Sequence, residues 1–197
     1  MEKEEINIIL ESEEGKKILK EVIREEIAKS TFGAPFINGV ELFNKTMGKV
    51  NNYSPIIPKD KKEWMFVYDF ILEETREYRQ SCEVGDIVGV LDALCDLAYV
   101  AVGNLALLHG IKDKFPQAFA EVQASNMSKA CKSQEEAEET IKVRSLEQGE
   151  DCHWEKHGEF FIVYRSRDRK VLKNINYFKP NLSQFFTEEE MNQSISV

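Results

Sequence analysis

Two neighbouring stretches decide the fold: FVYDFILEETREYRQ at residues 66–80 and LDALCDLAYVAVGNLALLHG at residues 91–110. Each is long and apolar enough to form a packed helix, yet each carries acidic residues among the apolar ones. The short connection at residues 81–86 allows the two helices to pack antiparallel. We therefore expect a helical hairpin whose facing sides carry carboxylates.

The acidic side chains of this hairpin have helical spacing. Residues three and four apart share a helix face, so Glu74 and Glu77 project together, as do Asp92 and Asp96. In a largely buried groove, ionised carboxylates would lose hydration and repel one another. A hard divalent cation removes this cost, and oxygen-only ligands favour magnesium or manganese over zinc. The sequence therefore predicts a Mg²⁺ site, with Mn²⁺ as the alternative, formed by these four residues.

Glu73 is adjacent to Glu74 in sequence but rotated away from it on a helix. We expect Glu73 to orient or deprotonate the attacking water, with a role in bridging metal ions as the alternative. For the three glutamates taken alone, a solvated helix face is the commoner explanation. The aspartates in the second, otherwise apolar helix favour a metal site.

These residues carry a resemblance to a known family. The segment EETRE at 73–77, followed by DALCDLAY at 92–99, resembles the EExxE and later ExxD pattern of the all-α nucleotide pyrophosphohydrolases, which include the MazG-like and phosphoribosyl-ATP pyrophosphohydrolase-like proteins. The sequence departs from the pattern at Ala93, where the family more commonly has Glu. Asp92 presents a carboxylate on nearly the same face.

Two later elements extend the resemblance, which runs from about Val40 to Leu182. SNMSK at 125–129 is similar to an Asn-x-Ser-Lys signature, and DRKVLK at 168–173 is similar to a DGKVLK element in which Arg169 replaces Gly. Lysine offers a point charge for phosphate, and asparagine an amide for ribose or phosphate. The candidate substrate contacts are Asn126, Lys129, Lys170, Lys173 and Tyr177, the last packing on sugar or base. Solvated lysines, and a tyrosine that merely covers the hairpin, are the alternatives.

Composition fits one compact protein in a reducing compartment. The chain has 197 residues, 42% apolar content and a net charge of −9, which argues against a partner held by a basic surface, such as a nucleic-acid polymer. Four scattered cysteines without CxxC spacing indicate reduced thiols, and no signal peptide is recognised, so we expect a cytoplasmic protein. Asp92, Asp96 and Asn104 interrupt the apolar region 91–108, which indicates a buried bundle helix rather than a membrane span.

A zinc site is the weaker alternative. Cys152, His153 and His157 lie close in sequence, and the histidines have i,i+4 spacing. Gly158 and the strand pattern after it argue against a continuous helix there, so we do not favour zinc.

The expected fold class is mainly α, a MazG-like helical bundle with a small C-terminal β-hairpin. We expect helices at about 13–30, 60–82 and 84–109, a short helix capped by Asn38 and running to Lys49, a helix in the middle of 111–130, and a capping box at Ser133 and Glu136. Strands are expected at 159–164 and 170–175, with Trp154 on an additional strand. The corresponding division is an N-terminal helical extension (1–35), a pyrophosphohydrolase core (36–148), a hairpin that closes over substrate (149–182) and a tail (183–197).

The predicted function is a Mg²⁺-dependent nucleoside triphosphate pyrophosphohydrolase, which releases a (deoxy)nucleoside monophosphate and pyrophosphate through a metal-activated water. A noncatalytic helical nucleotide-binding or regulatory protein is the alternative. The resemblance implies a homodimer or a dimer of dimers, and the apolar circumference of the long helices requires cover. We expect the hairpin to place Lys173 against phosphate, because regular strand alternation turns Lys170 to the opposite side and Lys173 matches the second lysine of the element.

Overall fold

The computed structural model describes residues 34–149 and 151–193. The helix expected at 13–30 lies outside these ranges. The chain forms two compact units, one of residues 1–118 and 183–197 and the other of residues 119–182. Within the described ranges it is mainly α-helical with one two-stranded antiparallel sheet, which confirms the predicted fold class.

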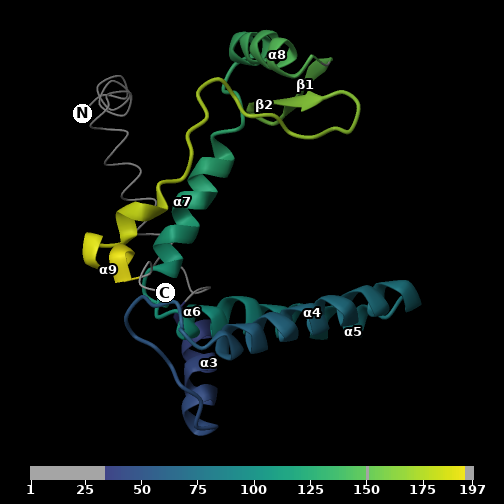
Figure 1. Cartoon of the computed structure of the whole chain (residues 1–197). Coiled ribbons are helices and arrows are strands. Elements are labelled where there is room, and N and C mark those ends of the chain that lie inside the picture. The colour runs from purple at the N-terminus through teal and green to yellow at the C-terminus, as the bar shows by residue number, and fades with distance from the viewer. Residues whose placement is uncertain (1–33, 150, 194–197) are drawn as a thin grey trace, which may run out of the picture. The chain divides into compact units, whose positions relative to one another are not determined.

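The first unit is built on the expected helical hairpin. Helix α4 (Lys61–Val84) and helix α5 (Ile87–Ala98) lie side by side (Figure 1). The Asp60 side chain caps α4 by accepting from the backbone N–H of Lys62, and Gly85 ends α4 in the left-handed conformation. Asp86 then caps α5 by accepting from the backbone N–H groups of Val88 and Gly89. These local signals explain why both helices begin and end close to their expected positions.

The second long helix is not a regular α-helix throughout. Helix α5 passes into a π segment, η1 (Tyr99–Asn104), and then into helix α6 (Leu105–Leu108). Eight residues of α-helix turn the chain by roughly 800°, which would leave Asn104 about 80° away from the face of Asp96. A π turn holds about one residue more than an α turn, so it cancels most of this angle. The π segment therefore returns Asn104 to the side that Asp96 occupies.

Helix α3 (Ala34–Thr46) covers the end of this helical pair. Its Ile37 and Val40 pack with Ala106 and Leu107 in the core of the first unit. The prediction that Asn38 caps a helix was wrong, because α3 begins at Ala34 and Asn38 lies inside it. Within α3 the Val40 side chain is buried, whereas that of Phe43 is exposed.

Much of the apolar surface of the hairpin is exposed. Val84, Ile87, Val88, Leu91 and Leu94 are all exposed. The region 91–108 is therefore exposed at its start, whereas its residues from 96 to 108 are half-buried or buried, as the sequence predicted for this helix. In the described part of the chain, one helical run, Ile87–Leu108, is long and apolar enough to cross a membrane by length and composition. Core helices of soluble proteins meet the same criterion, and this run carries two aspartates.

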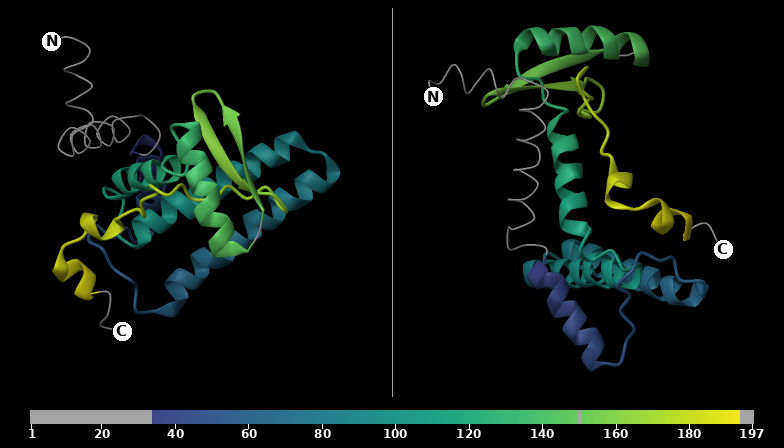
Figure 2. Two further views of the ribbon diagram at one scale, coloured as in Figure 1. Left: turned by 90° about the horizontal axis from the view of Figure 1, so that it is seen from above. Right: turned by 90° about the vertical axis from the view of Figure 1, so that its left-hand side faces the viewer.

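The boundary between the two units falls within helix α7 (Phe115–Met127). In the second unit, helix α8 (Gln134–Gln148) packs on a β-hairpin (Figure 2). The hairpin consists of β1 (Cys152–His157) and β2 (Phe160–Arg165). The Ser133 cap of α8 is confirmed, since its side chain accepts from the backbone N–H of Glu136. The Glu136 carboxylate accepts from the backbone N–H of Lys132 at 2.6 Å, so the returning bond of the predicted capping box is displaced by one residue. Cys131, Ala137, Val163 and Leu172 form the small core of this unit.

The hairpin differs from the predicted pairing. The additional strand expected around Trp154 is β1, and it pairs with β2 in the register Trp154–Val163. The strand predicted at 170–175 was wrong, because only Val171 forms a bridge, to Tyr164. After Val171 the chain contacts α8, where Arg144 donates to the carbonyl oxygen of Lys173 at 2.7 Å.

After the second unit the chain forms the 3₁₀ turn η2 (Leu182–Phe185) and helix α9 (Glu188–Gln193). Lys114 donates to the carbonyl oxygen of Phe185 and forms an ion pair with Glu190 at 3.1 Å. These contacts fasten the C-terminal segment to the first unit.

Candidate metal and nucleotide site

The acidic residues of the first unit gather around Glu74. Glu74 on α4 and Asp96 on α5 are half-buried, whereas Glu73, Glu77 and Asp92 are exposed. The groove is therefore less enclosed than the sequence predicted, and burial is concentrated on the one carboxylate in the middle.

Glu74 has an unfavourable environment for a lone carboxylate. Its Oε2 is buried and accepts no hydrogen bond from the described residues. Burial raises the pKa of Glu74, and the negative charges of Asp96, Glu77, Glu73 and Asp92 raise it further, in that order. The negative charges of the other four predicted acids thus all act on Glu74.

Ala93 occupies the position at which the family commonly has Glu. It is 2% exposed and is the buried residue of α5, whose neighbour across the hairpin is α4. A methyl group thus stands where a further carboxylate would face the groove, while Asp92 offers its carboxylate from the exposed side.

The acids suit a hard divalent cation by their chemistry. Across residues 34–149 and 151–193, no three His, Cys, Asp or Glu side chains are close enough together to hold a metal ion as they stand. The buried Oε2 of Glu74 nevertheless has no hydrogen-bond partner among the described residues, and four other carboxylates act on it electrostatically. The donor set fits Mg²⁺ or Mn²⁺, and ligation requires rotation of the exposed side chains around Glu74.

A cavity of about 290 Å³ lies in the first unit, and none of the five predicted acids lines it. Phe66 and Phe70 of α4 line it, with the ring centroids 4.7 Å apart, and Phe70 lies one helical turn before Glu74. Asn44 and Asn104 also line it, and the Asn44 amide donates to Asn104 Oδ1 at 3.2 Å. The π segment makes this possible, because it turns Asn104 toward α4.

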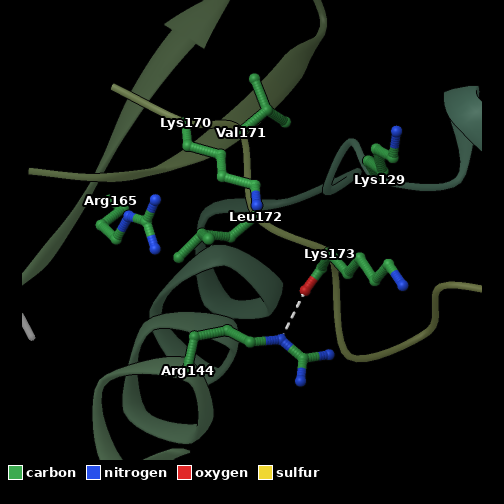
Figure 3. Close-up of a pocket in the computed structure, with 7 residues that line it drawn as sticks. All are labelled: Lys129, Arg144, Arg165, Lys170, Val171, Leu172 and Lys173. Atoms are coloured by element: carbon green, nitrogen blue, oxygen red, sulfur yellow. Dashed lines mark hydrogen bonds between the residues drawn. The ribbon is translucent and has the colours of Figure 1, made fainter. Parts of the chain in front are cut away.

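The predicted basic residues lie in the second unit. Figure 3 shows a pocket of about 560 Å³ lined by Lys129, Arg144, Arg165, Lys170, Val171, Leu172 and Lys173. Asn126 and Tyr177 stand beside it, since Lys129 donates to Asn126 Oδ1 at 2.8 Å and the Lys173 amine lies 4.5 Å from the Tyr177 ring centroid. All five predicted substrate contacts therefore belong to one neighbourhood, in a different unit from the acids.

Sequence reasoning missed Arg144 and Arg165. Arg144 reaches the pocket from α8, and Arg165 is the last residue of β2. The register could have identified Arg165, because its backbone N–H donates to the carbonyl oxygen of Lys170 at 2.9 Å and cross-strand partners share a face. That register depends on a pairing the sequence did not indicate.

The histidines near Cys152 have another role. Nε2 of His153 and Nε2 of His157 each lie 3.4 Å from a carboxylate oxygen of Glu155, and Arg169 donates to both oxygens of that carboxylate. The Arg169 guanidinium lowers the pKa of Glu155 to about 2. These side chains form an ion-pair network on the hairpin rather than a zinc site.

An antiparallel helix pair with EExxE on one helix and a pair of aspartates on the other defines the class of all-α nucleotide pyrophosphohydrolases. Residues 40–126 match the family model of phosphoribosyl-ATP pyrophosphohydrolase, a family within the MazG-like superfamily, in agreement with the resemblance seen in the sequence. The family in general depends on a divalent metal. No significant match was found among curated proteins or among solved structures.

Proposed function

We propose that the protein is a Mg²⁺-dependent nucleoside triphosphate pyrophosphohydrolase that releases a monophosphate and pyrophosphate. The family supports hydrolysis of a nucleotide pyrophosphate bond. The observation that carries the proposal is the half-buried Glu74, whose Oε2 has no partner and whose neighbours are four further carboxylates. Such a cluster is unfavourable until cations are bound, and cations are what a polyphosphate substrate also requires.

The carboxylates have distinct roles in this proposal. Glu74, Glu77 and Asp96 hold the ion or ions, with Asp92 completing the set from the exposed side. The bound ions neutralise phosphate oxygens and lower the pKa of the attacking water. Glu73 is exposed beside Glu74 and is free to orient that water or accept its proton.

The remaining parts of the nucleotide have candidate sites in both units. Phosphate would be bound by Lys129, Lys170 and Lys173, with Asn126 and Tyr177 on the sugar. The cavity of about 290 Å³ between Phe66, Phe70 and Asn104 lies at the small end of the range for ligand pockets, so it suits one ring system such as the base.

We also propose that two copies associate through the exposed face of α4 and α5. Val84, Ile87, Val88, Leu91 and Leu94 leave a large apolar surface along the hairpin. A second copy supplies a surface of the same kind, and a two-fold axis allows the two to cover each other. A dimer of soluble subunits accords with the proposed cytoplasmic location.

A nucleotide panel tests the proposed activity. The protein is incubated with each ribo- and deoxyribonucleoside triphosphate and Mg²⁺, and monophosphate, diphosphate, pyrophosphate and phosphate are separated. Monophosphate plus pyrophosphate is the expected product pair. Glu77→Gln should abolish turnover and weaken metal binding. Glu83→Gln is the matched control, because Glu83 is an exposed glutamate of the same helix that pairs with Arg79 at 2.7 Å. Near-normal turnover by Glu77→Gln would refute the assignment.

A noncatalytic nucleotide-binding protein is the second candidate, and Ala93 favours it. The buried methyl removes one carboxylate from the face that meets α4. Binding of nucleotide without products, at every Mg²⁺ and Mn²⁺ concentration tried, would establish this alternative.

A further inference from the structure

The basic pocket of the second unit lies beyond the part of the chain that matches the family. Its lining residues run from Lys129 to Lys173, whereas the match ends at residue 126. Five of the seven lining residues are cationic and none is acidic, in a chain whose net charge is −9. So many cations around about 560 Å³ repel one another, and an anion in the pocket would relieve this repulsion.

The charges inside the second unit are only partly compensated. Arg165 pairs with Asp168, and Arg144 pairs with Glu147. The three lysines have no acidic partner among the described residues. Lys129 donates to an amide oxygen and Lys173 lies over a tyrosine ring, while Lys170 forms no ion pair.

Arg165 and Lys170 are the best placed pair. They stand opposite each other across the short ladder that joins β2 to residues 170–172, with Tyr164 bridged to Val171. In Figure 3 the Arg165 guanidinium and the Lys170 amine point toward the same space above Leu172, while the Lys173 amine points away from it. Like charges directly opposite each other destabilise a sheet, so this pairing favours a bound anion between them. The regular strand that would have favoured Lys173 is absent here.

Asp168 now occupies the guanidinium fork of Arg165. Arg165 Nε donates to Asp168 Oδ1 at 2.9 Å, and a second nitrogen donates to Oδ2. Asp168 Oδ1 also accepts from the backbone N–H of Lys170 at 3.2 Å. A phosphate group presents the same bidentate geometry as a carboxylate and more charge, so it competes for this fork.

We propose that this pocket is an oligophosphate site complete within the second unit. Arg165 and Lys170 are its main contacts, and Asp168 is an internal competitor that holds Arg165 when no phosphate is bound. The pocket binds a pyrophosphate or triphosphate chain through protein cations alone, without a metal ion. This deepens the proposed function, on which its role rests, by assigning the site to the phosphate chain of the substrate or to released pyrophosphate.

The test measures the binding of inorganic tripolyphosphate to the full chain by calorimetry, in the presence of EDTA. Arg165→Gln should weaken binding by about tenfold or more, since it removes a charge-assisted bidentate contact. Asp168→Asn should tighten binding by about two- to fivefold, because it removes the competing charge while an amide oxygen can still accept from Lys170. Lys170→Ala should weaken binding more than Lys173→Ala.

Arg167→Gln is the matched control, because it removes the same charge two residues further along the chain, from a residue that does not line the pocket. An equal loss in Arg165→Gln and Arg167→Gln would show only general surface attraction and would overturn the proposal. Weaker binding by Asp168→Asn, with its melting temperature unchanged, would overturn the competitor role and the site with it.

Failure of this inference and failure of the proposed function are distinguishable. Turnover of nucleotides by a protein that does not bind tripolyphosphate in EDTA would refute the pocket and leave the activity. Binding that follows the variant order above, in a protein without turnover, would confirm the pocket and refute the activity.

Discussion

Replacing Glu74 by glutamine should separate stability from function. In the metal-free protein Glu74 lowers the stability of the fold. Its Oε2 is buried without a hydrogen-bond partner among the described residues, and four other carboxylates act on it electrostatically. Glutamine has nearly the same shape and no charge, and its amide can donate to Asp96 or Glu77. We therefore expect Glu74→Gln to make the metal-free protein more stable.

The magnitude follows from the single unsatisfied oxygen. A buried polar group without a hydrogen bond costs about 1–3 kcal/mol. In a domain of this size, each kcal/mol shifts Tm by about 2–4 °C. Glu74→Gln should thus raise Tm in EDTA by about 2–12 °C.

Thermal unfolding with and without Mg²⁺ is the assay. The wild-type protein should gain stability as Mg²⁺ is added, because the ion binds the folded state. Glu74→Gln should gain little from Mg²⁺ and should lose turnover. Glu73→Gln is the control, since Glu73 is exposed, and it should change the free energy of unfolding by no more than about 0.5 kcal/mol. A lower Tm for Glu74→Gln than for wild type in EDTA would refute this account of the cluster.

Three further predictions concern the first unit. The pKa of the buried Glu41 is lowered to about 2 by hydrogen bonds from Lys112, Lys45 and Tyr53. Its contribution to the free energy of unfolding, at most about 3 kcal/mol, is therefore present above pH 4.5 and is lost as the pH falls from 4.5 to 2. Denaturant titrations at each pH should show that Glu41→Gln removes this part of the acid dependence. Gly103→Ala should lower stability by about 1–3 kcal/mol, measured by urea unfolding, because its Cβ would lie 2.5 Å from Cγ2 of Val40. The solution mass of the wild-type protein should be at least twice the 22.8 kDa of one chain, and Leu91→Lys should reduce this mass. Leu42→Lys is the control, because Leu42 lies on the exposed face of α3, and it should leave the mass unchanged. A wild-type mass near 22.8 kDa at micromolar concentration would contradict the proposed dimer.

The sequence by itself determined the features that depend on short-range geometry. Helix α4, its cap Asp60 and the Ser133 cap of α8 follow from residues within one or two turns. The pairing of α4 with α5 follows for the same reason, because helical periodicity fixes faces locally and a short connection leaves only antiparallel packing. The family motif could be recognised because its spacing is local too.

Tertiary structure decided whatever depends on residues distant in sequence. The two edges of β2 pair with segments that precede and follow it in the chain: β1 forms the ladder on one edge, and residues 170–175 contribute a single bridge on the other. That pairing, with α8 packed on it, brings Arg144 and Arg165 to the basic pocket. Burial also depends on residues distant in sequence. Periodicity shows which acids share a helix face, but only packing determines that Glu74 is the acid with an oxygen that is buried and has no hydrogen-bond donor among the described residues.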